Sequence, residues 1–369
     1  MPDFYIGLMS GTSLDGVDGV LVDFSPRTPL VIDHACVPFP AQLKAELLAL
    51  NTAGDNEIHR ACVAGNALMR LYSGIVQRLL ERANAPASSV QAIGAHGQTV
   101  RHRPQEFDGT GYTVQLCQPA LLAELTGIDV VADFRSRDVA AGGQGAPLAP
   151  FFHQSLFSRP GETVGVLNIG GISNLTLLRP DGSMLGFDCG PGNSLMDSWC
   201  ALHTGEDYDA DGAWAASGRF LQPLLDVLLA EPYFAKPPPK STGRDLFSQS
   251  WLNAQVQKFG GAEPADVQAT LAELTARVYG SDVYKHEPEL PRLIVCGGGA
   301  LNGHLLRRLQ SFLPEVEVAS SADWGLPPLQ VEATAFAWLA RKAVRREKLE
   351  LQSTTGAKGA RVLGCIYPA

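Results

Sequence analysis

Residues 4–24 read FYIGLMSGTSLDGVDGVLVDF, and this stretch decides the fold. Two β-like runs, 4–8 and 17–24, flank the segment 9–16, which is rich in turn-forming residues. The pattern predicts a strand, a polar hairpin loop and a second strand. The same order of strand, Gly-rich loop and strand returns at 163–169, 170–174 and 175–178. Each half of the chain is therefore predicted to open in the same way.

Helical and strand patterns both follow these hairpins, which indicates an α/β protein. Helices are predicted over residues 41–50, 56–83, 263–281, 302–312 and 331–348. Further strands are predicted at residues 90–94, 130–134 and 293–296.

The length of 369 residues favours two domains with separate cores. We expect residues 1–135 to form the first domain and residues 136–369 to form the second, with inserted helices. The Gly-rich passage 140–147 suits the crossing between the domains. We also expect the extreme C-terminus to pack back on the first domain.

The composition excludes several classes of protein. A hydrophobic fraction of 45% and a charged fraction of 18% are those of an ordinary globular protein. The formal net charge of -9 works against non-specific binding to nucleic acid. The seven cysteines are scattered without zinc-type spacing, so we expect reduced thiols. With neither a secretion signal nor an apolar run of about 18 residues, we expect a cytoplasmic protein that binds no membrane.

The first loop has the composition of a phosphate-binding loop. Glycines let backbone approach a ligand, and hydroxyls and carboxylates can contact phosphate or hold a hydrated metal. An isolated loop of this kind is more often a plain hairpin turn. The candidate cofactor-binding residues are Gly11, Thr12, Ser13, Leu14, Asp15, Gly16, Val17 and Asp18.

Two further Gly-rich loops strengthen the case for a nucleotide. The second hairpin loop contributes Gly170, Gly171 and Asn174, and two such hairpins facing each other could grip the β- and γ-phosphates of ATP. A third loop follows a predicted strand and opens a helix, where nucleotide groups meet a helix N-terminus; close strand-to-helix packing explains it equally well. Its candidate residues are Gly297, Gly298, Gly299 and Asn302.

Asp188 is the candidate catalytic residue. It is predicted to lie at the end of a short β-like run, and the following residues 189–193, Cys-Gly-Pro-Gly-Asn, break regular structure. An acid presented in this way suits a general base, because its position is fixed while the loop leaves room for a substrate. An Asp that only initiates a turn is the commoner occurrence of this pattern.

Polar side chains also follow two other predicted strands. A sugar offers hydroxyls, an amide and a carboxylate, and such side chains, with one arginine for the carboxylate, would bind it. Solvated loop charges are the alternative, and an isolated histidine is most often structural. The candidate substrate-binding residues of these two segments are His96, Gln98, Thr99, Asp133 and Arg135.

Other catalytic patterns are missing from the sequence. It contains no G-x-S-x-G elbow, no H-E-x-x-H helix, no dinucleotide fingerprint and no Walker loop. These absences weaken serine-hydrolase, metalloprotease, dehydrogenase and P-loop interpretations.

Taken together, the chain resembles the anhydro-N-acetylmuramic acid kinase family, within the superfamily of sugar kinases and actin. The resemblance runs essentially end to end. It rests on Gly7–Asp18, His96–Thr99, Asp133–Arg135, Gly142–Leu148, Asn168–Gly171, Phe187–Asn193, Lys240–Arg244 and Val295–Gly299.

The resemblance implies two actin-like, ribonuclease H-like domains around a central cleft that binds ATP with Mg²⁺, the metal ligands being unknown. It implies that Asp188 activates water to attack the anomeric carbon of 1,6-anhydro-N-acetylmuramic acid, while the freed O6 takes the γ-phosphoryl group. The product would be N-acetylmuramic acid 6-phosphate, in peptidoglycan recycling. Arg135, Thr99 and Glu332 match positions expected to line the sugar pocket, and family habit suggests a homodimer.

Three alternatives remain open from sequence. The first is a kinase of the same superfamily that acts on an ordinary hexose without adding water. The second is a sensor protein that binds ATP and sugar without catalysing a reaction. The third is an anhydro-sugar hydrolase, which would have no need for adenosine-type loops.

Overall fold

A computed structural model describes residues 2–243 and 246–369, and it consists of two compact units. The first unit runs to Leu156 and also includes Leu329–Ala369, whereas the second is Phe157–Pro328. These bounds differ from the predicted domains 1–135 and 136–369. Arg244, part of one matched segment, lies outside the described residues.

The observed boundary lies after the predicted one, because buried hydrogen bonds link the segment that follows residue 135 to the first unit. Asp138 is fully buried, and its carboxylate accepts hydrogen bonds from the Gly145 amide at 2.6 Å and from the Thr355 hydroxyl at 2.6 Å. A buried carboxylate needs such partners. The Gly-rich passage 140–147 therefore belongs to the first unit, together with a C-terminal segment longer than the predicted one.

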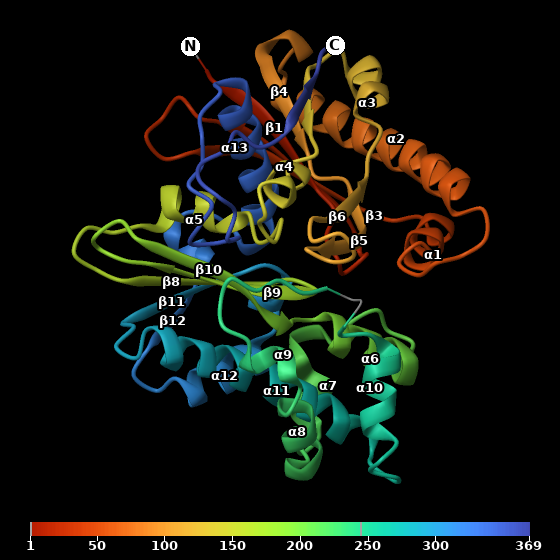
Figure 1. Ribbon diagram of the computed structural model, residues 1–369, viewed down its shortest axis with the longest axis vertical. Coiled ribbons are helices and arrows are strands. Elements are labelled where there is room, and N and C mark those ends of the chain that lie inside the picture. The colour runs from red at the N-terminus through yellow and green to blue at the C-terminus, as the bar shows by residue number, and fades with distance from the viewer. Residues whose placement is uncertain (1, 244–245) are drawn as a thin grey trace. The chain divides into compact units, whose positions relative to one another are not determined.

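The elements of the first unit are strands and helices, and three consecutive strands come first (Figure 1). They are β1 (Phe4–Met9), β2 (Gly16–Asp23), β3 (Leu30–Pro38), α1 (Ala41–Ala49), α2 (Glu57–Ala83), β4 (Val90–Ala95), β5 (Gln98–Pro104), β6 (Gly111–Leu116), α3 (Pro119–Thr126), β7 (Val130–Ala132), α4 (Ser136–Ala140), α5 (Ala149–Phe157), α13 (Val331–Val344) and β13 (Cys365–Tyr367).

The sheet of the first unit has the strand order β13-β7-β4-β1-β2-β3. The strands β1, β2 and β3 form an antiparallel meander, while β4 lies parallel to β1 and β7 parallel to β4. Helix α2 covers one face through an apolar core that includes Leu8, Tyr72 and Ile75. Helix α13 covers β1 and β4 (Figure 1).

Two paired glycines bring α13 against this sheet. Gly7 of β1 and Gly94 of β4 are register partners. A Cβ atom on Gly7 would lie 1.8 Å from the Ala333 carbonyl oxygen, and one on Gly94 would lie 2.1 Å from that of Phe336. Only glycine permits this approach of helix backbone to strand backbone. The approach fixes the position of the helix whose first turn carries Glu332.

The elements of the second unit likewise begin with three consecutive strands (Figure 1). They are β8 (Val164–Ile169), β9 (Ile172–Leu178), β10 (Met184–Pro191), α6 (Ser194–Thr204), α7 (Ala213–Ser217), α8 (Gln222–Leu229), α9 (Pro232–Ala235), α10 (Gln249–Val256), α11 (Pro264–His286), β11 (Arg292–Cys296), α12 (Gly303–Phe312) and β12 (Glu317–Ser320).

The sheet of the second unit has the order β10-β9-β8-β11-β12. Again three strands form an antiparallel meander, and two further strands continue in parallel from its first strand. Alternate residues such as Leu167, Leu175 and Phe187 pack in one core with apolar residues of α6, α8 and α11. The repeated strand order is that of the ribonuclease H-like fold, which confirms the predicted fold class.

Most predicted elements occur, with several differences in their bounds; for example, α11 extends to His286, beyond the predicted residue 281. The strand that carries Asp188 continues to Pro191, so Asp188 lies within β10 and not at its end. A register shift between Asp188 and Gly190 marks a β-bulge there. Helix α13 ends at Val344, before the predicted residue 348. Throughout the described ranges, every helix is too short or too polar to cross a membrane.

Candidate active site

A row of polar side chains crosses the sheet of the second unit. Asp188 of β10 pairs with Asn174 of β9, which in turn pairs with Asn168 of β8. Their chain neighbours Phe187, Leu175 and Leu167 all face the helical core, so the three polar side chains share the opposite face. Directly paired residues have Cβ atoms about 5 Å apart. The sheet thus places a carboxylate beside two amides.

One atom of this row is short of a hydrogen bond. The Asn174 side-chain oxygen is buried and has no hydrogen-bond partner among the described residues. Buried polar atoms are normally satisfied, and an exception calls for an explanation such as a ligand. Asn174 therefore remains a candidate for ligand binding, although it lies in a strand and not in the loop predicted from sequence.

Backbone amides hold Asp188 itself. The Thr242 amide donates to Asp188 Oδ2 at 3.1 Å, and the Asp188 amide donates to the Lys240 carbonyl oxygen at 3.1 Å. The Tyr233 hydroxyl donates to the Asp188 carbonyl oxygen at 2.8 Å. Asp188 as a whole residue is 5% exposed. A segment more than 50 residues further along the chain thus fixes the orientation of the carboxylate.

The turn between β8 and β9 meets the start of α6. The Asn193 amide donates to the Gly170 carbonyl oxygen at 2.8 Å, and the Gly192 amide donates to that of Gly171 at 2.9 Å. A Cβ atom on Gly192 would lie 2.2 Å from the Gly170 oxygen. The glycine at position 192 therefore lets the turn between β8 and β9 pack closely against the start of α6.

The third Gly-rich loop reaches the same place. A Cβ atom on Gly297 would lie 2.6 Å from the Ile169 carbonyl oxygen, and one on Gly299 would lie 3.2 Å from Asn193 Oδ1. Gly297 also has a positive φ of 77°, which favours glycine. Segments around residues 170, 193 and 298 are therefore brought together within one unit.

Asn302 has a structural task. Its side-chain oxygen accepts from the Leu305 amide at 2.9 Å and caps the N-terminus of α12. This contact explains why an asparagine follows the glycine triplet. Only its remaining amide group is left to contact a nucleotide.

In the first unit, hydrogen bonds between the turn after β1 and the segment that follows β4 hold that turn in place. The His96 ring donates through Nδ1 to the Ser10 carbonyl oxygen at 3.1 Å, and Gln98 Nε2 donates to that of Gly11 at 3.0 Å. The Ser10 hydroxyl donates to the Gly97 carbonyl oxygen at 2.9 Å. His96 and Gln98 are both buried, so the structure uses these predicted sugar ligands to support the loop.

Arg135 completes this arrangement. Its Nη2 group donates to His96 Nε2 at 2.9 Å, and its Nη1 group donates to the Gly145 carbonyl oxygen at 2.8 Å. The His96 ring also packs on Phe336 of α13 at 4.7 Å between centroids. Glu332 lies one helical turn before Phe336 and hence on the same face of α13. The structure therefore brings Arg135 and His96 together, beside the helix whose first turn carries Glu332.

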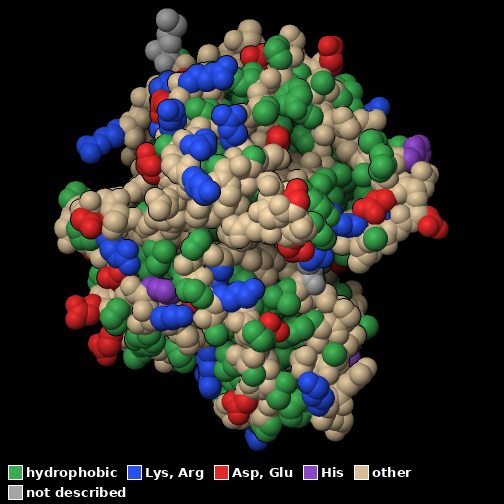
Figure 2. All heavy atoms as spheres, in the orientation of Figure 1, with side chains coloured by type: hydrophobic (Ala, Val, Ile, Leu, Met, Phe, Trp, Pro, Cys, Tyr) green, Lys and Arg blue, Asp and Glu red, His purple; other side chains and the backbone are tan. Residues whose placement is uncertain are grey.

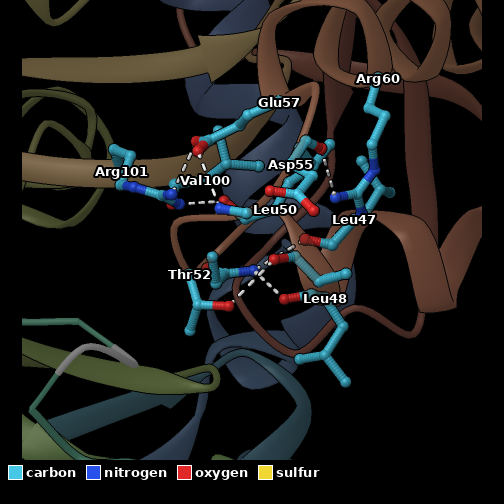
Figure 3. Close-up of polar contacts among 12 residues, drawn as sticks. Leu47, Leu48, Leu50, Thr52, Asp55, Glu57, Arg60, Val100 and Arg101 are labelled. Carbon is cyan, nitrogen blue, oxygen red and sulfur yellow. Dashed lines mark hydrogen bonds and ion pairs between the residues drawn. The ribbon is translucent and has the colours of Figure 1, made fainter.

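Arg101, two residues after Thr99, makes structural contacts with the α1–α2 connection (Figure 3). Its guanidinium donates to the Leu50 carbonyl oxygen, to that of Val100 at 3.0 Å and to the Glu57 carboxylate at 2.7 Å. These bonds join β5 to the connection between α1 and α2, and they suit a cation near a helix C-terminus. Arg101 thus holds the fold of this region.

The first loop is shorter than predicted, because β2 already begins at Gly16. Leu14 and Val17 are buried in the apolar core, so only their backbone could contact a nucleotide. A Cβ atom on Gly16 would lie 2.4 Å from the Val37 carbonyl oxygen, which explains this glycine by strand packing. Asp18 lies 3.2 Å from the His34 ring.

The residues Gly11, Thr12, Ser13 and Asp15 form the turn itself. The Ser13 hydroxyl donates to the Asp15 carboxylate at 2.8 Å. Asp15 is exposed, so its other oxygen faces solvent or a ligand.

Thr99 and Asp133, also predicted to bind the sugar, have local partners. The Thr99 hydroxyl accepts from Gln115 at 3.3 Å. Asp133 is exposed, has a positive φ of 55° and accepts from the Ser136 amide at 3.3 Å. A left-handed conformation in a non-glycine residue is uncommon and is often found at functional sites.

Comparison with known proteins identifies the family. The family described as "Anhydro-N-acetylmuramic acid kinase" matches residues 3–369 of this chain. The chain belongs to this family. The anhydro-N-acetylmuramic acid kinase of Variovorax paradoxus (strain S110) is 64% identical, with 100% of this chain and 99% of the relative covered. That of Albidiferax ferrireducens is 60% identical, with both chains covered at 100%.

A solved structure supports the fold assignment alone. The protein titled "Reductive activator for corrinoid,iron-sulfur protein" has a TM-score of 0.50 and 13% sequence identity, covering 93% of this chain and 61% of its own. The shared fold thus accommodates a protein of another title, and the assignment to the anhydro-N-acetylmuramic acid kinase family rests on sequence.

Two residues of this family member were missed in the sequence analysis of the site. Asn193 bridges two Gly-rich segments, and Lys240 contributes the carbonyl oxygen that accepts from Asp188. Both stand inside segments on which the family resemblance rests. Neither carries a pattern of its own, because an Asn after Gly-Pro-Gly and a Lys after three prolines are typical of loops.

Basic side chains gather elsewhere on the first unit. On the face shown in Figure 2, Lys and Arg are concentrated over the region where Figure 1 places α13. Arg341 and Arg345 both pair with Asp3, at 2.8 Å and 2.7 Å, and Lys342 pairs with Glu347. Acidic partners therefore offset this basic helix end.

The burial of His96 predicts a pH-dependent stability for this kinase. Burial, and secondly the positive charge of Arg135, lower the pKa of His96 from 6.5 to about 3. The unfolded chain therefore binds a proton below pH 6.5 that the folded chain excludes, so stability falls as the pH drops through this window. The loss from this residue amounts to about 2 kcal/mol at pH 5 relative to pH 8.

Chemical denaturation of the wild type and of His96→Asn at these two pH values measures this effect. The asparagine keeps a donor near Nδ1 but does not titrate, so its stability should change less between pH 8 and pH 5. Equal changes in both proteins would contradict a neutral buried His96.

Proposed function

We propose that this chain cleaves the 1,6-anhydro bridge of 1,6-anhydro-N-acetylmuramic acid with water and phosphorylates O6 at the expense of ATP. The products are N-acetylmuramic acid 6-phosphate and ADP, and the reaction serves peptidoglycan recycling. Family membership over the whole chain supports the kinase activity. The observation that supports the chemistry is the oriented carboxylate of Asp188 beside Asn174, on the sheet whose Gly-rich turns meet at one place.

Asp188 acts as the general base. Its carboxylate takes a proton from water as the water oxygen forms a bond to the anomeric carbon. The bond between the anomeric carbon and O6 breaks, and O6 takes the γ-phosphoryl group. The Thr242 amide holds one carboxylate oxygen during this step, and positioning of this kind contributes much of the rate enhancement.

Three Gly-rich segments fit the phosphates of ATP. The backbone around Gly170, Asn193 and Gly298 converges within the second unit, where a Cβ atom on Gly192, Gly297 or Gly299 would collide with a neighbour. The turn of the first unit offers the Ser13 hydroxyl and the Asp15 carboxylate, which would hold hydrated Mg²⁺. When bound, MgATP supplies the phosphoryl group and neutralises charge on it.

Arg135 and Glu332 contact the sugar in this proposal. The Arg135 guanidinium is oriented by His96 and by the Gly145 carbonyl oxygen, and it would pair with the lactyl carboxylate. Thr99 and Asp133 contribute further polar contacts. We also propose a cytoplasmic homodimer, which size-exclusion chromatography with light scattering tests.

The central experiment measures ADP release with a panel of amino sugars in ¹⁸O-water. We expect ADP release to depend on the anhydro sugar, and mass spectrometry of the quenched product to show one ¹⁸O at the anomeric carbon and none in the phosphate. Reducing N-acetylmuramic acid, incubated in parallel, controls for spontaneous exchange. Equal turnover of ordinary hexoses without label would overturn the proposal.

A further inference from the structure

A buried lysine lies behind the carboxylate proposed as the general base. The Lys240 side chain is 3% exposed, and its Nζ atom lies 3.8 Å from Asp282 Oδ2 of α11. The ammonium group also lies 5.3 Å from the centre of the Phe187 ring and 5.1 Å from that of Tyr233. Lysine is among the residues least often buried, and it is almost never fully buried unless paired.

This ion pair is a poor source of stability. Removing both charges from water carries a desolvation cost that the attraction at 3.8 Å offsets only in part. Burial raises the pKa of Asp282, and the charge of Lys240 opposes that increase. The raised pKa reflects the desolvation cost of the buried carboxylate. An apolar pair of the same volume would stabilise the unit at least as well, so the charges call for another explanation.

The backbone of Lys240 supplies that explanation. Residues 240–242 run beside β10 as an irregular segment, which we name the strap. The strap contacts Asp188 twice, since the Lys240 carbonyl oxygen accepts from its amide at 3.1 Å and the Thr242 amide donates to its carboxylate at 3.1 Å. The strap has no helix or strand of its own to hold it, and the Lys240 side chain anchors it in the core.

Two features make Asp188 sensitive to the position of the strap. The bulge after Asp188 breaks the ladder with β9, since Asp188 pairs with Asn174 but Gly190 already pairs with Ser173. Bulges often re-aim a side chain next to an active site. The Tyr233 hydroxyl, which donates to the Asp188 carbonyl oxygen at 2.8 Å, belongs to the same ring that faces the Lys240 ammonium. Backbone and ring thus connect Lys240 with Asp188 on both sides.

We propose that Lys240, through its buried pair with Asp282, is a positioning residue that holds the strap and thereby orients the Asp188 carboxylate for proton abstraction. This inference rests on the proposed function of Asp188 as the general base. It adds Lys240 and Asp282 as residues on which that function depends. Lys240 touches neither substrate nor nucleotide in this role, so its loss should act on kcat more than on ATP binding.

The test compares Lys240→Met, Asp282→Asn and the double variant Lys240→Met/Asp282→Asn with the wild type. The double variant leaves no uncompensated buried charge, so it should remain folded where a single variant is destabilised. We expect kcat to fall about 10- to 100-fold in Lys240→Met and in the folded double variant, as for outer residues that orient a functional group. The KM for ATP should change by less than about threefold.

Lys236→Met is the matched control. It makes the same chemical change four residues earlier, at an exposed lysine whose Nζ atom lies 5.7 Å from the centre of the Tyr233 ring. Its kcat should equal that of the wild type. Circular dichroism and thermal unfolding confirm that each protein compared is folded.

Combination with Asp188→Asn separates positioning from general damage. If Lys240 acts through Asp188, the variant Asp188→Asn/Lys240→Met should be no slower than Asp188→Asn alone. The inference would be overturned if the losses in kcat of the two single variants multiplied in Asp188→Asn/Lys240→Met. It would also be overturned if the folded variant Lys240→Met/Asp282→Asn kept the wild-type kcat. Full activity of Asp188→Asn would instead overturn the proposed base, so the two failures are distinguishable.

Discussion

Replacement of Asp188 by asparagine is expected to lower kcat by about 10²- to 10⁴-fold, the usual contribution of a general base. Asparagine keeps the size of the side chain and an oxygen that can accept from the Thr242 amide, so the strap stays in place. It has no basic carboxylate to take the proton from water. The KM for ATP should therefore remain within about twofold of the wild-type value.

The matched control is Asp181→Asn, at the turn between β9 and β10. Asp181 accepts from the Ser183 amide at 2.8 Å at the opposite end of the same strands, so its loss should leave kcat unchanged. Steady-state ADP release with purified anhydro sugar measures both variants. Turnover of Asp188→Asn close to that of the wild type would exclude Asp188 as the base.

The fold could be predicted because the patterns that indicate its strands and turns lie within short stretches of the sequence. Residues 4–24 alternate and turn within one hairpin, and β1 and β2 were found close to their predicted limits. The glycines at 7 and 94 carry no such signal, because their need arises only where α13, more than 200 residues away, contacts both strands. The domain boundary was missed for the same reason, since Asp138 is held by Thr355.

The residues of the candidate site were easier to predict from the sequence than the contacts that each of them makes. Asp188 and the Gly-rich loops were recognised from composition and resemblance, yet the sequence placed Asp188 at a strand end where the structure has a bulge within β10. His96 was predicted to contact the sugar, whereas both ring nitrogens are used by Ser10 and Arg135. Such roles depend on contacts between distant segments, which no local pattern records.

Replacement of Arg135 by alanine is expected to lower kcat/KM for 1,6-anhydro-N-acetylmuramic acid by about 10- to 150-fold, since a hydrogen bond to a charged group contributes about 1.5–3 kcal/mol. The guanidinium is already oriented by His96 and the Gly145 carbonyl oxygen, so little freedom is lost when it pairs with a carboxylate. The effect should appear mainly in KM for the sugar.

The substrate offers the sharpest control for this prediction. 1,6-Anhydro-N-acetylglucosamine lacks the lactyl carboxylate, so the wild type and Arg135→Ala should use it with similar, low kcat/KM. Arg137→Ala removes an exposed guanidinium two residues away and should leave both sugars unaffected. An equal loss with both sugars in Arg135→Ala would assign Arg135 to the support of the loop through His96, because only pairing with the carboxylate makes the loss depend on the lactyl group.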